Sequence, residues 1–448
     1  MRITVAGTGY VGLVTGVVLA EIGHDVTCVD VNEDKIQMMR AGKCPIFEEG
    51  LQELMIKNKE RINYTTQYEA AYKNADIIYV GVGTPERADG TANLEYVMTA
   101  CNQIAESLEH DCIVVIKSTV PIRTNDMIEK FLNEHVKKGI HVDVVSNPEF
   151  LSQGTAVHDT LYAARIILGV ENEIAKKKMS KVYEPLTKEP YNQPILFMNR
   201  RSAEMVKYAS NDFLALKISY INEIANFCET VGANVEDVSL GMGLDSRIGN
   251  KFLKPGIGYG GSCFPKDTKA LHATSKELGM ELLTVKSAIE VNKRQKHRLF
   301  DMVYNDFEGK LAGLRIACLG VTFKPGTDDL REAASIESIK ILLDYGVKIM
   351  VYDPVGLENF KKIFGDSIVY HTNIDDTIRN ADCCLIFTEW QEVKDYDINK
   401  FELLMHQPLV YDGRNCYSLS DVKKTNITYK SIGRPVINKK KLMIENVK

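Results

Sequence analysis

The sequence predicts an α/β protein in which two Rossmann-like, doubly wound domains are joined by a central helical domain with one long helix. Two stretches alternate short apolar strands with helices, one starting at residue 2 and one at residue 314, and a helical pattern without glycine or proline runs between them from Ser202 to Val231. Strands alternating with helices favour parallel sheets covered on both faces. Because 448 residues exceed what one core supports, we expect three domains, at residues 1–196, 197–305 and 306–448.

The first domain opens with a complete βαβ pattern. A short apolar strand at residues 2–6 precedes GTGYVG, an apolar helix follows from about Val11 to Ile22, Gly23 fits a helix C-cap, and DVTCVD reads as the next strand. Further strands are predicted at 76–83, 112–118 and 142–148, with a helix at 94–108. In such sheets the loops after the strand carboxyl ends line the ligand crevice.

The GTGYVG turn carries the features of a dinucleotide site. Gly7 permits a tight turn, Gly9 lets the backbone approach a pyrophosphate, Gly12 lets helix pack on strand, and the helix N-terminus adds a positive dipole end. Asp30 ends the next strand, where a carboxylate accepts hydrogen bonds from the ribose hydroxyls of NAD and repels the extra phosphate of NADP. We therefore expect NAD; the alternative is a Rossmann scaffold that binds no nucleotide.

The central segment is helical. A helix of about 30 residues would be ~45 Å long, which suits a spine joining two domains and an interface for a two-fold dimer. Further helices are predicted at 265–278 and 283–304.

The third segment begins another βαβ pattern. Strands are predicted at 314–323, 347–354, 381–390 and 408–413, with a helix near 333–345. It lacks the glycine fingerprint, because Gly320 is followed by Val-Thr-Phe-Lys. This asymmetry indicates two different nucleotide ligands, with a duplicated scaffold that is only structural as the alternative.

The loop PGIGYGGSCFPKD, residues 255–267, combines glycines with a thiol, a cation and a carboxylate. Pro265 fits the first position of a helix, so Cys263 would sit just before its N-terminus, where the dipole and Lys266 favour a thiolate. A thiolate attacks carbonyls, and Asp267, about one turn on, could activate a water to cleave an acyl-enzyme. The alternative is a small buried cysteine.

Lys207 and Asn211 are four residues apart on the predicted long helix and therefore share a face. A lysine and an amide together can hold a developing oxyanion. The alternative is an ordinary solvated face of the helix.

Composition narrows the range of partners and compartments. A net charge of −5 with 26% charged residues gives no general affinity for nucleic acid, and no apolar run approaches the ~18 residues of a membrane span. The ten cysteines form no C-x-x-C pair, which fits a reducing cytoplasm. No Cys/His cluster has the spacing of metal ligands, so we expect no metal.

Taken together, the motifs resemble those of the nucleotide-sugar 6-dehydrogenases, the UDP-glucose/GDP-mannose dehydrogenase family. The likeness covers nearly all of residues 1–435 and rests on motifs in order: GTGYVG with Asp30, VGTP at 82–85, STVP at 118–121, NPEFL at 147–151, KYASNDFLALKISYINE at 207–223, GNKFLKPGIGYGGSCFPKD at 249–267, FKPGTDDLRE at 323–332 and YDGRN at 411–415.

The resemblance implies a four-electron oxidation with NAD as cofactor. The C6 alcohol of the sugar becomes an aldehyde, a cysteine adds to it as a thiohemiacetal, a second oxidation leaves a thioester, and water releases a carboxylate. It further implies that the N-terminal domain binds NAD, that the C-terminal domain binds the UDP part, and that the chain forms a homodimer. The glycine loop looks most like the UDP-glucose branch, so the implied substrate is UDP-glucose; GDP-mannose or a UDP-N-acetylhexosamine are alternatives.

The family's catalytic roles carry over residue by residue. Cys263 matches the nucleophile, Lys207 and Asn211 match the oxyanion pair, and Asp267 matches the carboxylate that assists water. Thr119 and Glu149 match residues near the reacting C6 and its water.

Binding residues carry over in the same way. The residues matched to the NAD site are Gly7, Gly9, Tyr10, Val11, Gly12, Asp30, Lys35, Thr84, Thr119, Gln153, Lys266 and Arg331. The residues matched to the nucleotide-sugar site are Glu149, Phe150, Leu151, Ser152, Lys207, Asn211, Arg247, Phe252, Leu253, Lys254, Gly256, Gly258, Gly260, Lys324 and Arg414. Arg247 resembles an arginine that reaches the substrate of a neighbouring subunit.

Two features depart from the family pattern. Many relatives have a glutamate where this chain has Gln153, which cannot act as a base, so a base role there would fall on Glu149 or Asp267. The tail INKKKLMIENVK lies beyond the usual core, and we expect a mobile basic end.

A competing function from another class is a non-catalytic sensor of NAD and nucleotide sugar, for which Cys263 would be dispensable.

Overall fold

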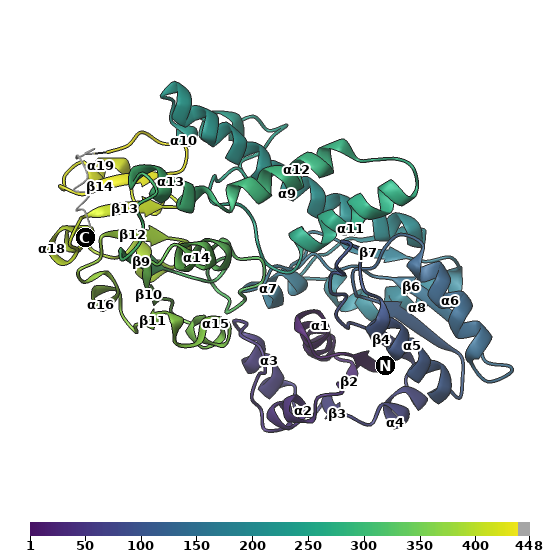
Figure 1. Ribbon diagram of the computed structural model, residues 1–448. Helices are drawn as coiled ribbons and strands as arrows, with labels where there is room; N and C mark the ends of the chain where they lie inside the picture. The colour runs from purple at the N-terminus through teal and green to yellow at the C-terminus, as the bar shows by residue number, and fades with distance from the viewer. Residues whose placement is uncertain (438–448) are drawn as a thin grey trace. The chain divides into compact units, whose positions relative to one another are not determined.

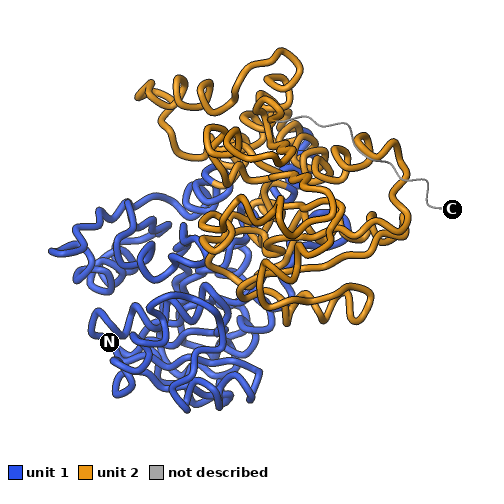
Figure 2. The backbone as a smooth tube through the Cα atoms, turned by 90° about the vertical axis from the view of Figure 1, so that its left-hand side faces the viewer, with its two compact units in different colours: residues 1–210, 269–280 blue, residues 211–268, 281–448 orange. Residues whose placement is uncertain are grey.

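The computed structural model describes residues 1–437, so all but the first residue of the predicted mobile tail lies outside it. Within it the chain forms two compact units (Figure 2). The first comprises residues 1–210 and 269–280, and the second comprises residues 211–268 and 281–448 as far as they are described.

The first unit is built on an eight-stranded sheet with the order β3-β2-β1-β4-β5-β6-β7-β8 (Figure 1). Its pairs are parallel except for β6 with β7. The strands are β1 (Arg2–Ala6), β2 (Asp25–Val29), β3 (Ile62–Thr65), β4 (Ile77–Val80), β5 (Cys112–Ile116), β6 (Val142–Ser146), β7 (Ile166–Gly169) and β8 (Ile195–Met198). The central strands β4 and β5 are buried along their whole length, as expected when helices cover both faces.

Two helical layers bury this sheet. One core joins it to α1 (Tyr10–Glu21), α2 (Glu33–Arg40), α3 (Leu51–Lys57), α7 (Ala156–Leu161) and α8 (Glu173–Tyr183). A second core joins it to α4 (Tyr68–Lys73), α5 (Glu95–Ser107) and α6 (Thr124–His135). The topological switch lies between β1 and β4, because successive crossovers from β1 run to opposite sides.

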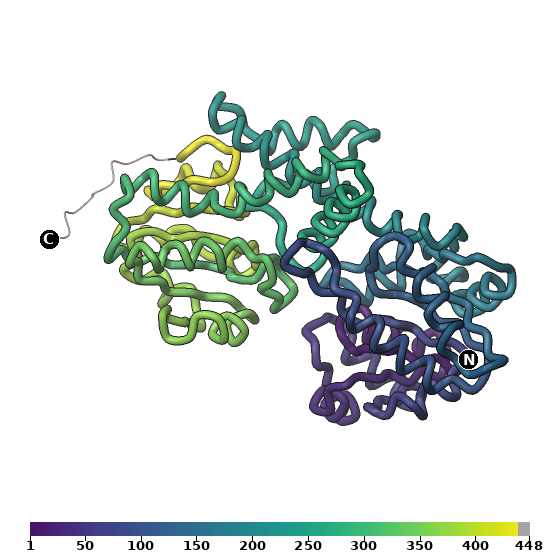
Figure 3. The backbone as a smooth tube through the Cα atoms, turned by 45° about the vertical axis from the view of Figure 1, so that its right-hand side comes forward, coloured from purple at the N-terminus to yellow at the C-terminus, as the bar shows by residue number. Residues whose placement is uncertain are grey.

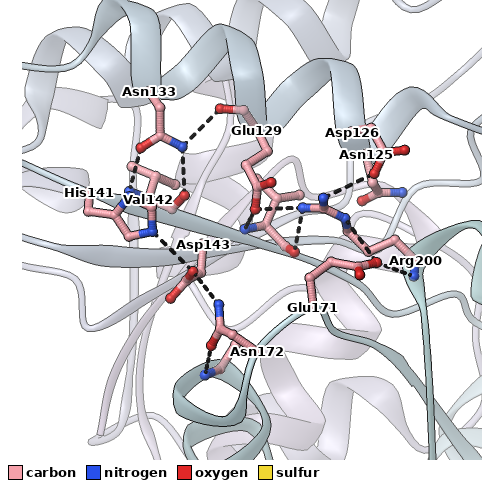
Figure 4. Close-up of polar contacts among 12 residues, drawn as sticks. Asn125, Asp126, Glu129, Asn133, His141, Val142, Asp143, Glu171, Asn172 and Arg200 are labelled. Carbon is pink, nitrogen blue, oxygen red and sulfur yellow. Dashed lines mark hydrogen bonds and ion pairs between the residues drawn. The ribbon is translucent and has the colours of Figure 1, made fainter.

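The long helix α9 (Arg200–Val231) is anchored at its start by a buried polar cluster of the first unit (Figure 4). The Arg200 guanidinium is 7% exposed and pairs with Asp126 at 3.0 Å and Glu129 at 2.5 Å. Nearby, Asn133 bonds to the N–H and the C=O of Val142. These contacts fix the first turn of α9 against α6 and β6.

The second unit contains a six-stranded, wholly parallel sheet with the order β11-β10-β9-β12-β13-β14. The strands are β9 (Arg315–Leu319), β10 (Lys348–Tyr352), β11 (Val369–Tyr370), β12 (Cys383–Ile386), β13 (Leu409–Asp412) and β14 (Thr428–Ser431). In Figure 3 this sheet is the green-to-yellow part of the chain.

Helices also cover both faces of the second sheet. One core joins it to residues 221–228 of α9 and to α10 (Val235–Gly243), α13 (Arg298–Asp306), α14 (Ala334–Asp344) and α15 (Leu357–Phe364). The other core joins it to α16 (Ile374–Ile378), α17 (Gln391–Lys394), α18 (Asn399–Leu404) and α19 (Leu419–Val422). The remaining helices are α11 (Phe264–Glu277), α12 (Leu283–Gln295) and two short 3-10 turns, Glu184–Thr187 and Gly365–Ser367.

The predicted fold class is therefore confirmed, with two local corrections. The single helix expected at 283–304 is two helices, α12 and α13, because the chain turns at Lys296 and His297, where His297 N–H donates to the Arg294 carbonyl. Helix α11 begins at Phe264, so Pro265 occupies its second position rather than its first. The three-domain boundaries stay a prediction.

Candidate functional site

The turn between β1 and α1 has the shape of a dinucleotide cradle. Gly7 has φ +90°, and a Cβ on Gly12 would lie 2.0 Å from the Gly7 carbonyl oxygen, so protein packing explains both glycines. A Cβ on Gly9 would meet nothing within 4 Å. Packing therefore does not account for Gly9, whereas a pyrophosphate lying over the start of α1 would.

Asp30 follows β2 and faces this turn. Its Oδ2 accepts hydrogen bonds from the Thr8 N–H at 2.9 Å and the Thr8 hydroxyl at 2.5 Å, and its Oδ1 accepts from the Asn32 N–H at 3.0 Å. Burial opposes ionisation of the carboxyl, but these hydrogen bonds and the nearby Lys35 charge outweigh it, so the pKa of Asp30 is lowered. The carboxylate is thus preset to accept ribose hydroxyls, and the residues present fit NAD.

The other predicted cofactor residues of the first unit lie on loops around this turn. Tyr10 opens α1 and its hydroxyl donates to the Phe47 carbonyl at 2.6 Å, with Val11 beside it. Thr84 follows β4, and its hydroxyl donates to the Thr119 carbonyl at 2.9 Å. Gln153 is partly buried in the turn before α7.

Lys207 and Glu149 form a buried ion pair. The Lys207 Nζ lies 2.9 Å from Glu149 Oε1, and the two side chains are only 3% and 6% exposed. Glu149 Oε2 also accepts the Leu151 N–H at 2.7 Å, which fixes the loop of Phe150, Leu151 and Ser152. The Lys207 side chain does not belong to a solvated helix face.

Lys117, at the end of β5, is a functional candidate that the sequence reasoning missed. Its ammonium is 9% exposed and donates to Asn147 Oδ1 at 3.2 Å, an oxygen that also accepts the Tyr183 hydroxyl at 2.5 Å. Burial is the main cause that lowers the pKa of Lys117 to about 8. The negative charge of Glu149 raises this pKa, and the positive charge of Lys207 lowers it further. A lysine next to the STVP motif was the available signal, but burial of a cation is not visible in sequence.

In the second unit, Cys263 lies at the start of α11, as predicted. Its carbonyl accepts the Asp267 N–H at 2.9 Å, which is the first hydrogen bond of the helix, and its Sγ lies 3.8 Å from the Ser262 hydroxyl. The side chain is partly exposed, whereas the free thiols of Cys28, Cys101 and Cys318 are buried and have raised pKa values. Cys263 is therefore accessible at a helix N-terminus.

Asp267 is held by two donors. Asn211 Nδ2 donates to its Oδ2 at 2.6 Å, and Lys266 Nζ lies 2.6 Å from its Oδ1. Asp267 is 1% exposed and Asn211 is 6% exposed. The structure thus brings together three of the predicted residues with the turn that carries Cys263.

The glycines of the loop before Cys263 are explained by protein contacts. A Cβ on Gly258 would lie 2.6 Å from Asn292 Oδ1, and one on Gly260 would lie 2.5 Å from the Glu332 carbonyl. Asn222 Oδ1 accepts the Gly256 N–H at 2.8 Å, and Gln295 donates to the Gly256 carbonyl at 2.6 Å. Close packing fixes this loop, and Asn222, Asn292 and Gln295 are supporting residues that the sequence did not single out.

The remaining predicted residues differ in their surroundings. Arg414 ties three loops together, donating to the carbonyls of Phe387 at 2.9 Å and Phe323 at 3.1 Å. Arg331 and Arg247 are exposed and each pairs with a nearby aspartate. Phe252 and Lys254 are exposed, Leu253 is 2% exposed, and Lys324 is partly buried with its Nζ 5.6 Å from the ring centroid of Phe323.

Asp353 follows β10 as Asp30 follows β2, but Asp353 is 2% exposed, whereas Asp30 is partly exposed. Asp353 accepts the N–H groups of Val321 at 2.7 Å and Gly356 at 2.7 Å and the Trp390 indole N–H at 3.1 Å. The second Rossmann-like unit therefore does not repeat the ribose site of the first, as the missing fingerprint predicted.

Two further properties apply to the described residues. Within residues 1–437, no helix is both long and apolar enough to cross a lipid bilayer. Nor do three or more His, Cys, Asp or Glu side chains of that range gather in an arrangement that could hold a metal ion.

Comparison with known proteins identifies the family of the chain. Three domain profiles of the UDP-glucose/GDP-mannose dehydrogenase family match in order: the NAD-binding domain at residues 1–187, the central domain at 201–294 and the UDP-binding domain at 317–419. Such proteins are dehydrogenases with separate sites for NAD and for a nucleotide sugar, and the chain shows both the NAD cradle and the second, different nucleotide fold.

Individual relatives are similar over nearly their whole length. A UDP-glucose 6-dehydrogenase of Bacillus subtilis is 46% identical over 98% of this chain and 98% of its own. A UDP-glucose 6-dehydrogenase of Rhizobium meliloti is 44% identical over 97% of this chain and 100% of its own. The solved structure of a UDP-glucose dehydrogenase from Pyrobaculum islandicum has a TM-score of 0.89 at 34% identity, covering 97% of this chain and 98% of that one. The chain belongs to the UDP-glucose/GDP-mannose dehydrogenase family, and it is an NAD-dependent oxidoreductase that acts on a nucleotide sugar.

Proposed function

We propose that the chain oxidises UDP-glucose at C6 to UDP-glucuronate in two successive two-electron steps. The full-length similarity to two UDP-glucose 6-dehydrogenases, at 46% and 44% identity, supports this substrate. The observation that carries the chemistry is the joining of Asp267 to Asn211 at 2.6 Å on the turn that begins with Cys263. A nucleophile, an amide donor and a carboxylate are what a covalent aldehyde oxidation requires.

The first oxidation converts the C6 alcohol to an aldehyde. NAD, when bound, accepts one hydride in each of the two oxidations. Gly7, Gly9 and Gly12 would hold its pyrophosphate and Asp30 its ribose, while Glu149 and Thr119 would lie near the reacting C6 and its water. The alcohol proton passes through the water to the Glu149 carboxylate, while Lys207, held by Glu149 at 2.9 Å, donates a hydrogen bond to the alcohol oxygen.

The second oxidation and hydrolysis take place on Cys263. Its thiolate adds to the aldehyde carbon to give a thiohemiacetal, whose oxyanion receives hydrogen bonds from Asn211 and from Lys207, one turn earlier on α9. Loss of a hydride from C6 of this oxyanion leaves a thioester. Asp267 then takes a proton from water as the water oxygen attacks the acyl carbon, the C–S bond breaks, and Sγ leaves as thiolate.

The other predicted binding residues keep the roles that the family likeness implies. We propose that Phe252, Leu253 and Lys254 contact the nucleotide sugar together with Arg414 and Lys324. We also propose that residues 1–196 form the NAD domain, 197–305 the central domain and 306–448 the UDP domain.

We propose that the chain is a homodimer formed through α9 and α10. Phe213, Tyr220 and Phe227 are 61%, 48% and 63% exposed along α9. Leu240 of α10 is 64% exposed, and Leu244, directly after α10, is 78% exposed. Exposed apolar side chains gathered on neighbouring helices mark association surfaces. Changing Phe213 and Phe227 to glutamate should give a monomer in sedimentation equilibrium, and a monomeric wild type would refute the proposal.

We also propose a cytoplasmic location, because the ten cysteines, all within residues 1–437, are not joined in disulfides, which suits a reducing compartment.

Product stoichiometry tests the proposed reaction. With NAD and limiting UDP-glucose, we expect two NADH and one carboxylate per sugar. Running GDP-mannose and UDP-N-acetylhexosamines in parallel tests the alternative substrates, and a faster rate on either would reassign the substrate. One NADH per sugar with a stable aldehyde would contradict the four-electron scheme.

A further inference from the structure

Asp212, next to Asn211 on α9, is a buried carboxyl whose presence the proposed chemistry leaves unexplained. It is 6% exposed, and among residues 1–437 neither of its oxygens has a hydrogen-bond partner. Burying a polar group without a partner is unfavourable, and such groups in a folded protein usually meet a water, an ion or a catalytic need.

The groups around Asp212 come from three elements. On its own helix, Asn211 donates to Asp267 Oδ2 at 2.6 Å. On α11, Asp267 is close enough for its charge to act on Asp212, and Lys266 occupies its other oxygen at 2.6 Å. In the glycine loop, burial raises the pKa of Tyr259 to about 12, and the charge of Asp212 adds to this.

The two carboxyl groups therefore differ in what they can still accept. Both oxygens of Asp267 already receive a hydrogen bond from the protein, whereas both oxygens of Asp212 are open within the described chain. A buried water typically makes about three hydrogen bonds to otherwise unsatisfied groups. A water that donates one hydrogen bond to Asp267, whose oxygens each have a second lone pair, would find an open acceptor for its other proton on Asp212.

We propose that Asp212 is a positioning residue which, as a neutral carboxyl, holds the water that cleaves the Cys263 thioester and orients it toward Asp267. The inference rests on the proposed thioester route. In the step itself, one water proton passes to Asp267 while the other is hydrogen-bonded to Asp212, the water oxygen bonds to the acyl carbon, and the C–S bond breaks to release thiolate. Asp212 keeps its proton throughout.

The chemistry of the site supports a neutral carboxyl. Burial, together with the charge of Asp267, raises the pKa of Asp212 to about 8, so the acid form predominates at pH 7. Two ionised carboxylates in one buried place would repel each other. A neutral group that only accepts or donates a hydrogen bond can be replaced by an amide.

Three variants separate this role from a structural one. Asp212→Leu keeps the branched shape of the side chain but removes the acceptor, Asp212→Asn keeps a carbonyl acceptor, and Glu277→Leu removes an exposed carboxyl at the end of α11 as a control. Rapid-quench measurements with UDP-glucose and NAD follow NADH and the acyl group on Cys263 separately.

We expect Asp212→Leu to form the acyl-enzyme at the wild-type rate and to hydrolyse it about tenfold more slowly, the worth of roughly one hydrogen bond. Asp212→Asn should restore most of the hydrolysis rate, and Glu277→Leu should match wild type. If Asp212→Leu does not fold, Asp212→Ala takes its place.

Two outcomes would overturn the proposal: unchanged hydrolysis in Asp212→Leu, or hydrolysis in Asp212→Asn as slow as in Asp212→Leu. A purely structural carboxyl would give the first outcome together with equal or higher thermal stability. If no variant, nor the wild type, ever carries an acyl group on Cys263 while uronate still forms, the thioester route itself fails, and this result is distinct from both.

Discussion

Replacing Lys207 by methionine tests the buried pair with Glu149. The pair is joined at 2.9 Å, and its side chains are 3% and 6% exposed, so the variant leaves a carboxylate buried without this cation. Removing one partner of a buried ion pair typically costs about 3–5 kcal/mol. Because the charge of Lys117 also acts near Glu149, we expect the lower end, ~3 kcal/mol of unfolding free energy.

Activity should respond separately from stability. Loss of one oxyanion donor lowers kcat by about 10²–10³. The double variant Lys207→Met/Glu149→Gln removes the uncompensated charge, so we expect its unfolding free energy to return to within ~1 kcal/mol of wild type while its kcat stays low. Stability and rate would thus be uncoupled in one pair of proteins.

The stability assay must report unfolding of the first unit, which contains Lys207 and Glu149. The single tryptophan, Trp390, lies in the second unit, so hydrogen exchange at β6 in increasing urea is the appropriate measure of stability, alongside steady-state kcat. If Lys207→Met kept its protection at β6, the buried pair would not stabilise the fold as inferred. If it kept kcat, Lys207 would have no part in the chemistry.

Three further predictions follow from single features. Gly9→Ala should fold normally yet bind NAD at least tenfold more weakly in calorimetry. Gly12→Ala should instead fail to fold, because its Cβ would lie 2.0 Å from the Gly7 carbonyl oxygen. Equal NAD affinity in Gly9→Ala and wild type would contradict the proposed pyrophosphate site. Asp30→Ala should raise the KM for NAD and narrow the preference over NADP in initial-rate assays, and an unchanged preference would remove Asp30 from the ribose site. Lys117 has a folded pKa of about 8, below that of an unfolded lysine, so the unfolded chain binds more protons between pH 8 and about 10.4, and the unfolding free energy of wild type rises there. Lys117→Met should therefore be more stable than wild type at pH 7 and lose that advantage by about 1.4 kcal/mol per pH unit above pH 8 in denaturant titrations. A pH-independent difference would show that the folded protein does not lower the pKa of Lys117.

The strands and helices that the sequence predicted are those with strong local signals. β4 and β5 are continuous apolar runs, β1 and β6 are mostly apolar, and α9 has no glycine or proline along its length. The edge strand β11 was not predicted because its two residues are too few for periodicity to identify. The edge strand β3, INYT, was not predicted because Asn63 and Thr65 interrupt its apolar residues. The break between α12 and α13 carries no glycine or proline, so nothing local marked it.

The residues of the candidate site also divide into those that the local sequence indicated and those that it did not. Cys263 and the glycine fingerprint were visible because their residue types and spacing carry chemistry. Lys117 and Asp212 were not, because their significance lies in burial, and Asn211 meets Asp267 only through the fold, at a separation of 56 residues. Partner identity across such distances is a tertiary property that one sequence does not encode locally.

The central claim, that the sugar is oxidised while attached to Cys263, is tested most directly by acid-quenching the Asp267→Asn variant with UDP-glucose and NAD and mapping the adduct by mass spectrometry. We expect a uronyl thioester on the peptide that contains Cys263, and none in Cys263→Ala. Uronate formation by Cys263→Ala with two NADH per sugar would contradict it.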